Sequence, residues 1–294
     1  MCPPPTPPPA ARPGARDTPP TAADGPGGNG ASAGTPARVA AVGPYFAVSS
    51  GPRADAAGFR PFTALHHDPA PLAAYVAETG RRLGTDQRRV AASTLHIGTA
   101  ARLWSVALAT AALTGRAVDL TPERLWWRTP PSGPIELWLP EWPAGTPAGT
   151  SGGIPGEDVP GALYETVVVR HLGPLDEALR RDFGLSPRIL HGNSASALLG
   201  AVRVLLARVP DAPWSPLPVA AALLAREPLA SAGVLTADTC GAGLGGADVG
   251  GVGPRGAGPR GADDPLSYRR NSCCLYYRVR GNGYCGDCIL ARPR

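Results

Sequence analysis

The chain has 294 residues, enough for one or two domains with a substantial core. Its 38 glycines and 36 prolines make up about a quarter of the sequence, so folded regions must alternate with regions that cannot form a core. The net charge is +5 and all 28 basic residues are arginine, a bias that GC-rich codon usage explains. It is no sign of phosphate binding, and we expect no nucleic-acid partner.

The N-terminal region is rich in proline, alanine and glycine. Residues 1–40 contain almost no large apolar side chains, so we expect a disordered tail in which Cys2 is an incidental thiol. The start of the chain lacks the basic and apolar regions of a secretory signal. The longest apolar run, 103–113, is too short to span a bilayer, so no transmembrane segment is expected. These observations favour a cytoplasmic protein whose thiols stay reduced.

Helical patterns dominate from about residue 68. The clearest has Asn193 as its expected N-cap and an apolar stripe that continues to Val209. A second long helix is expected from the spacing of Ile97, Trp104 and Leu108. The remaining signals are proline or acidic residues at helix starts and glycine at helix ends. Besides the helix from Asn193, helices are predicted over 71–83, 86–113, 121–126, 175–183 and 218–226.

Two segments have the features of strands. Residues 135–139 alternate apolar and polar side chains, and 163–172 contain the β-branched run Thr166-Val167-Val168-Val169. We expect these two strands to pair in antiparallel fashion. The predicted fold class is therefore α+β: a helix-rich domain over 41–235 with a small antiparallel β element.

A glycine-rich stretch, 236–264, follows and is expected to be a linker. Gly241, Gly243 and Gly246 have the G-x-G-x-x-G spacing, but a dinucleotide fingerprint needs a strand before it and a helix after it, and here more glycine follows, so a nucleotide site is not indicated. Cys240 lies here and has no assigned role. The linker leads to a short C-terminal segment, 265–294.

Four of the six cysteines lie in that C-terminal segment: Cys273, Cys274, Cys285 and Cys288. Thiolates favour zinc, copper(I) or iron–sulfur clusters. One pair has the regular Cys-x-x-Cys spacing, but the other is adjacent, so a tight local turn is needed to bring both thiols to one small ion. A two-iron cluster is a wider target. The residues alone leave open a 2Fe–2S cluster, a zinc site, and disulfides or free thiols.

Charge is concentrated in the same segment. From residue 265 to the end there are six arginines and one acid, so this segment carries the whole net charge of +5. Positive charge stabilises an anionic metal–thiolate centre, and it favours a cluster without excluding zinc.

The run from Arg269 to Arg278, continued by Tyr284 to Cys288, resembles the C-terminal segment of the FhuF-like ferric siderophore reductases. That family carries a 2Fe–2S cluster on Cys-Cys-x10-Cys-x2-Cys, and this chain matches every cysteine. Two stretches, 100–104 and 191–198, resemble the family with less specificity. The resemblance implies that Cys273, Cys274, Cys285 and Cys288 are the cluster ligands. It also implies that a ferric siderophore is the substrate.

Other polar residues of the chain have two interpretations. Arg269, Arg270, Arg278 and Arg280 either contact an anionic ferric chelate or an acidic electron donor such as a ferredoxin, or they only compensate the charge of the cluster. The segment's tyrosines, Tyr268, Tyr276, Tyr277 and Tyr284, are expected to dock it on the helical domain. The five histidines are expected at the surface or in hydrogen bonds of the core, with His191 as a candidate for substrate contact.

The leading hypothesis is a one-electron oxidoreductase that reduces iron in imported ferric siderophores. The alternatives are a binding module that its 2Fe–2S or zinc centre only stabilises, and a redox sensor. No helix-turn-helix pattern supports DNA binding.

Overall fold

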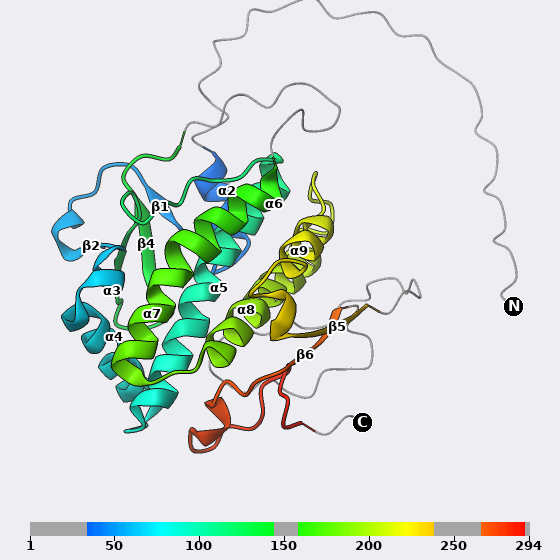
Figure 1. Cartoon of the computed structure of the whole chain (residues 1–294). Coiled ribbons are helices and arrows are strands. Elements are labelled where there is room, and N and C mark those ends of the chain that lie inside the picture. Colours follow the sequence, from blue (N-terminus) through cyan, green and yellow to red (C-terminus); the bar gives the residue numbers. More distant parts are fainter. Residues whose placement is uncertain (1–33, 144–157, 238–265, 292–294) are drawn as a thin grey trace, which may run out of the picture.

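A computed structural model describes residues 34–143, 158–237 and 266–291 (Figure 1). The fold is α+β, as expected: long helices pack side by side, and a small sheet lies at one side of them. The long helices are α4 (Pro69–Leu83), α5 (Arg88–Thr114), α7 (Gly173–Phe183), α8 (Pro187–Arg208) and α9 (Pro216–Leu224). The predicted helices over 71–83, 86–113, 175–183 and 218–226 are therefore confirmed to within a few residues.

The ends of these helices follow simple capping chemistry. Asp68 caps α4 by accepting a hydrogen bond from the Ala70 N–H, and Gly84 ends this helix in the left-handed conformation. Gly184 ends α7 in the same way, as its sequence predicts. For α8 the prediction was wrong: the N-cap is Ser186, and Asn193 lies inside the helix and is fully buried.

Short elements complete the helical part. They are α2 (Thr35–Ala41), α3 (Ala64–His67), α6 (Val159–Leu163) and the single-turn helices η1 (Ala56–Gly58), η3 (Ala230–Ala232) and η4 (Tyr276–Arg278). Most of helix α2 lies within residues 1–40, which the composition predicts to be a disordered tail. The helix is ordered because its Val39 is fully buried in the core. A single buried apolar side chain can fix a short helix against the core, and the average composition of forty residues does not reveal one such side chain.

The sheet has four strands in the order β1-β4-β3-β2. Their bounds are β1 (Ser49–Ser50), β2 (Arg60–Pro61), β3 (Trp126–Arg128) and β4 (Glu136–Leu139). Strand β4 is the one predicted over 135–139, but its antiparallel partner is β3, with Trp127 opposite Leu137. The predicted helix over 121–126 is a turn instead, because Asp119 accepts from the Thr121 N–H and Trp126 already begins β3.

The predicted strand over 163–172 is also wrong. This segment is a π-helix, η2 (Tyr164–Leu172), that continues directly into α7. Its buried residues, Val167, Val168, His171 and Leu172, have helical rather than alternating spacing. The β-branched run favours a strand locally, but packing of this face on the core decides the conformation.

A buried arginine joins α5 to the sheet. Arg102 is 2% exposed and donates to the carbonyl oxygens of Ile135 (2.9 Å), Pro44 (3.0 Å) and Ala47. Each edge of the guanidinium therefore has an acceptor. Burial lowers the pKa of Arg102 to about 10, and the group stays protonated at neutral pH.

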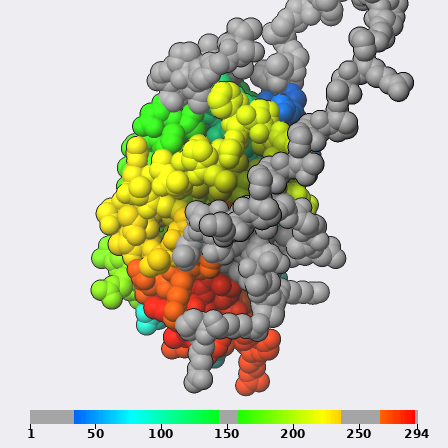
Figure 2. Space-filling model, turned by 90° about the vertical axis from the view of Figure 1, so that its right-hand side faces the viewer, coloured from blue at the N-terminus to red at the C-terminus, as the bar shows by residue number. Residues whose placement is uncertain are grey.

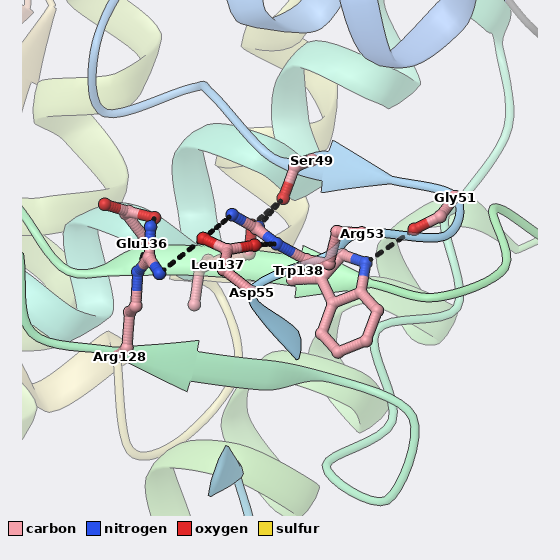
Figure 3. Close-up of polar contacts among 8 residues, drawn as sticks. All are labelled: Ser49, Gly51, Arg53, Asp55, Arg128, Glu136, Leu137 and Trp138. Carbon is pink, nitrogen blue, oxygen red and sulfur yellow. Dashed lines mark hydrogen bonds and ion pairs between the residues drawn. The ribbon is translucent and has the colours of Figure 1, made fainter. Parts of the chain in front are cut away.

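The outer face of the sheet carries a chain of ion pairs (Figure 3). Arg128 contacts Asp55 at 2.6 Å and Glu136 at 2.7 Å, and Asp55 also pairs with Arg53 at 2.5 Å. Arg53 reaches the Ser49 hydroxyl at 2.9 Å, which ties the loop after β1 to the sheet. These groups are exposed or partly exposed, so each pair contributes little stability singly, but together they help to fix the two-residue strand β1.

Helices α5 and α8 pack against each other through the centre of the molecule (Figure 1). By length and composition alone, both are apolar enough to cross a membrane. In each, 72% of the most apolar window is buried inside the protein, which is typical of the core helices of a soluble protein.

Acid should destabilise this fold through two buried histidines. Burial is the main cause that lowers the pKa of His171 to about 3 and that of His66 to about 4, below the ordinary 6.5. The neutral forms are therefore favoured in the folded state. Their contribution to the free energy of unfolding is complete above pH 6.5. It is lost as the pH falls, at about 1.4 kcal/mol per pH unit for each histidine.

Urea unfolding between pH 7 and pH 4.5 measures this slope. We expect the His171→Gln variant to be less stable at pH 7 but to lose stability less steeply with acid. An unchanged slope in the variant would contradict the assignment to His171.

Candidate metal centre

A two-stranded hairpin places the cysteine segment. Strand β6 (Leu266–Arg270) pairs antiparallel with β5 (Gly233–Ala237), with Arg270 opposite Gly233 and Leu266 opposite Ala237. Strand β5 crosses the expected boundary at 235/236. The rest of the expected linker, with the three glycines and Cys240, lies outside the described residues. The space-filling view shows that the described part of the C-terminal segment, 266–291, which we call the cysteine segment, lies at one end of the molecule (Figure 2).

The alternation of β6 decides which side chains face inward. Leu266, Tyr268 and Arg270 are buried, whereas Ser267 and Arg269 are exposed. Tyr268 joins the main hydrophobic core at 4% exposure, so it docks the segment as expected. Tyr276 and Tyr277 are half-buried, and Tyr284 is 52% exposed.

A chain of buried hydrogen bonds fastens the segment to α5 and α8. The Ser93 hydroxyl donates to the Cys274 carbonyl at 2.8 Å, and the Asn193 amide nitrogen donates to the Ser93 carbonyl at 3.0 Å. Arg270 Nη2 then donates to Asn193 Oδ1 at 2.7 Å. Ser93 and Asn193 thus hold the backbone of a cysteine, a role that the sequence did not reveal.

The first turn of α8 holds the same segment by its carbonyl oxygens. The Ser272 hydroxyl donates to the Arg188 carbonyl at 2.6 Å, and Arg270 Nη2 donates to the Ile189 carbonyl at 3.1 Å. Gly192 permits this approach: a Cβ there would lie 2.6 Å from Ser272 Oγ and 2.8 Å from Arg270 Nη2.

The adjacent cysteines lie on a tight turn, as their spacing requires. Leu275 has φ +68°, and among described residues it is the one non-glycine with positive φ. Its N–H donates to Cys273 Sγ at 3.3 Å. At the second pair, the Leu290 N–H donates to Cys288 Sγ at 3.4 Å. Such N–H···S bonds orient thiolates and stabilise their charge.

The four thiols are unequally exposed and none forms a disulfide. Cys274 and Cys288 are buried, whereas Cys273 and Cys285 are half-buried. Cys274 Sγ and Cys285 Sγ lie 3.5 Å apart. Their hydrogen bond is the main reason that the pKa of Cys274 falls and that of Cys285 rises.

These thiols fit an iron–sulfur centre. Two thiolates on one tetrahedral metal lie about 3.8 Å apart, near the Cys274–Cys285 distance. Across residues 34–143, 158–237 and 266–291, no three side chains of His, Cys, Asp or Glu are arranged to hold a single ion. A 2Fe–2S centre needs two thiolates on each of two irons, which is a less demanding convergence than four thiolates around one ion.

The four candidate arginines separate into two groups. Arg269, Arg278 and Arg280 are exposed, and Arg269 donates to the Ile289 carbonyl at 3.0 Å. Arg270 is 1% exposed, so it lacks the exposure that direct contact with a chelate or a donor protein needs, and its second interpretation, compensation of the cluster's charge, stays a prediction. The strand alternation of β6 turns this side chain inward, and the sequence shows that alternation only once β6 is known to be a strand.

The acid of the segment is also buried. Asp287 lies between the second pair of cysteines at 8% exposure, and Arg203 of α8 approaches its carboxylate at 3.6 Å. The carboxylate is therefore held by α8. Nothing in the sequence indicates this partner.

The histidines are placed apart from this arrangement. His66, His96 and His171 are buried in the helical core, and His67 is exposed. His191 is half-buried and lines a pocket of about 230 Å³ between α7 and α8, together with Asp176 and Ser194. Its role as a substrate contact stays a prediction.

Comparison with known proteins gives one match. The model of the FhuF 2Fe–2S C-terminal domain matches residues 270–288, which contain all four cysteines. No curated protein and no solved structure matches the chain. The match begins at Arg270, which hydrogen bonds fix to α8, and ends at Cys288. The cofactor is a 2Fe–2S cluster, and the chain carries an FhuF-like C-terminal domain to bind it.

Proposed function

We propose that this protein passes single electrons to ferric iron held in siderophore chelates, in the cytoplasm. The observation that carries the proposal is a complete four-cysteine motif in a matched 2Fe–2S domain at one end of the molecule. A bound 2Fe–2S cluster supplies one electron at a time. Addition of that electron to ferric iron weakens its bonds to hard oxygen donors, so the chelate releases ferrous iron.

The residues of the segment support access for a partner. Cys273 and Cys285 are half-buried, and Tyr284, which precedes Cys285, is 52% exposed, so this part of the segment is accessible to solvent. Arg269, Arg278 and Arg280 present positive charge on the same segment. We propose that this charge attracts an anionic ferric chelate and an acidic donor protein such as a ferredoxin, which returns the electron.

Stopped-flow mixing tests the proposal. The protein is reduced anaerobically and mixed with ferric citrate or a ferric trihydroxamate in the presence of a chromogenic ferrous chelator. We expect reoxidation of the cluster with about one ferrous iron formed per reduced chain, since the cluster gives up one electron. The gallium complexes of the same chelators are the control, because gallium(III) binds the chelators but accepts no electron.

A cluster that stays reduced in the presence of both ferric chelates would contradict the proposal. That outcome would favour the binding-module alternative, in which the metal centre only orders the C-terminal segment.

A further inference from the structure

The described residues contain two buried arginines, and their hydrogen bonding differs. Arg102 satisfies Nε, Nη1 and Nη2 with three carbonyl oxygens. Arg270 uses Nη2 alone, toward Asn193 Oδ1 and the Ile189 carbonyl. Its Nε and Nη1 are buried and have no acceptor among the residues that the structure describes. A buried donor without an acceptor costs about 1–3 kcal/mol, more when it is charged.

The charge of Arg270 is a second observation. No ion pair to it is found in the described part of the chain, whereas the buried Asp287 is approached by Arg203. A buried guanidinium without a carboxylate is strongly disfavoured unless another anionic group lies nearby. The burial of Arg270 therefore implies that an anionic group accepts hydrogen bonds from its Nε–H and Nη1–H groups.

The cysteine segment is where that acceptor would be. Arg270 directly precedes the run Asn271-Ser272-Cys273. Asn193 links the guanidinium to the cysteines: it accepts from Arg270 Nη2 at 2.7 Å and donates to the Ser93 hydroxyl at 3.1 Å, and that hydroxyl donates to the Cys274 carbonyl at 2.8 Å. The guanidinium lies against Gly192, where a Cβ would be 2.8 Å from Nη2 and 3.0 Å from Nε, so α8 closes that side of the group.

We propose that Arg270 is a positioning and tuning residue whose Nε–H and Nη1–H groups donate to sulfur atoms of the bound 2Fe–2S cluster. The donors and the buried charge stabilise the more negative, reduced form, and they raise its reduction potential. The proposal depends on the cluster and goes beyond reductase activity, because it concerns the potential and not the electron acceptor.

A redox titration of the full, cluster-loaded chain tests this without any ferric chelate. At a fixed potential, we expect Arg270→Gln to lower the ratio of reduced to oxidised cluster at least tenfold, which is about 59 mV for one electron. Arg270→Lys keeps the charge, so its ratio of reduced to oxidised cluster should lie between those of Arg270→Gln and the unaltered protein.

The matched control is Arg269→Gln, which removes the same charge from the neighbouring exposed residue. Solvent screens that charge, so its effect should be small and should vanish at high salt. The effect at Arg270 should persist at high salt. Equal shifts in the two variants, or no shift at Arg270, would overturn the proposal.

Pulsed electron paramagnetic resonance of the reduced protein covers the case in which Arg270→Gln fails to load. With ¹⁵N-labelled arginine, we expect a ¹⁵N coupling and exchangeable-proton couplings to the cluster in the unaltered protein. The ¹⁵N coupling should persist in Arg269→Gln and disappear in Arg270→Lys. Absence of the ¹⁵N coupling in the unaltered protein, or its survival in Arg270→Lys, would refute the proposal even if the siderophore hypothesis held.

Discussion

Replacing Cys285 with serine should abolish the cluster. Purified anaerobically, the unaltered protein should be red-brown with about two irons and two sulfides per chain. A serine hydroxyl is a harder and less acidic ligand than a thiol, so one iron would lose a ligand. We expect Cys285→Ser to be colourless or to retain only a small fraction of the iron, measured by iron and sulfide analysis and by the visible spectrum.

Cys240→Ser is the matched control, because Cys240 lies outside the motif. It should bind iron and sulfide as the unaltered protein does. An unaltered protein that is colourless and holds one zinc, or a Cys285→Ser variant with full iron and sulfide, would contradict the ligand assignment.

Replacing Gly192 with alanine should force the cysteine segment away from α8. The new Cβ would lie 2.6 Å from Ser272 Oγ and within 3.0 Å of two Arg270 nitrogens, closer than real contacts allow. Overpacking of this kind costs about 1–3 kcal/mol. The shift would also strain the hydrogen bonds that hold Arg270 and Ser272, so we expect both lower stability by urea unfolding and poorer cluster retention.

Gly200→Ala provides the control within the same helix. A Cβ there meets nothing within 4 Å, so alanine should stabilise α8 by about 0.5–1 kcal/mol through its better helix propensity. The two substitutions are thus expected to have opposite signs. Stabilisation by Gly192→Ala with unchanged cluster content would show that the segment does not dock as described.

The helices were predictable where one periodic face was long enough. Helices α4, α5 and α7 lie within a few residues of their predicted bounds, and each ends at a glycine in the left-handed conformation: Gly84, Gly115 and Gly184. The segment 163–172 was not predictable in this way. Its valines favour a strand, and only the buried face that it shares with α7 makes it helical.

The site was predictable in its ligands but not in its support. The spacing of the four cysteines is plain in the sequence, and the resemblance implies the 2Fe–2S cofactor, which the family match supports. The support depends on residues far apart in the chain: Ser93 contacts Cys274 across 181 positions, and Asn193 contacts Ser93 across 100. Such pairs leave no local pattern. For the same reason the sequence indicates a helix cap at Asn193, and it leaves the role of Arg270 open between contact with a partner and compensation of charge.

The hairpin of β5 and β6 has a consequence for evolution of the chain length. Because Ala237 and Leu266 are register partners, the stretch between them begins and ends at neighbouring points of the protein. Insertions or deletions there would leave the register of the ladder and the spacing of Cys273, Cys274, Cys285 and Cys288 unchanged, and the entropy of closing a connection grows only with the logarithm of its length. We therefore expect the length of 238–265 to vary between related proteins more than the spacing of these four cysteines does.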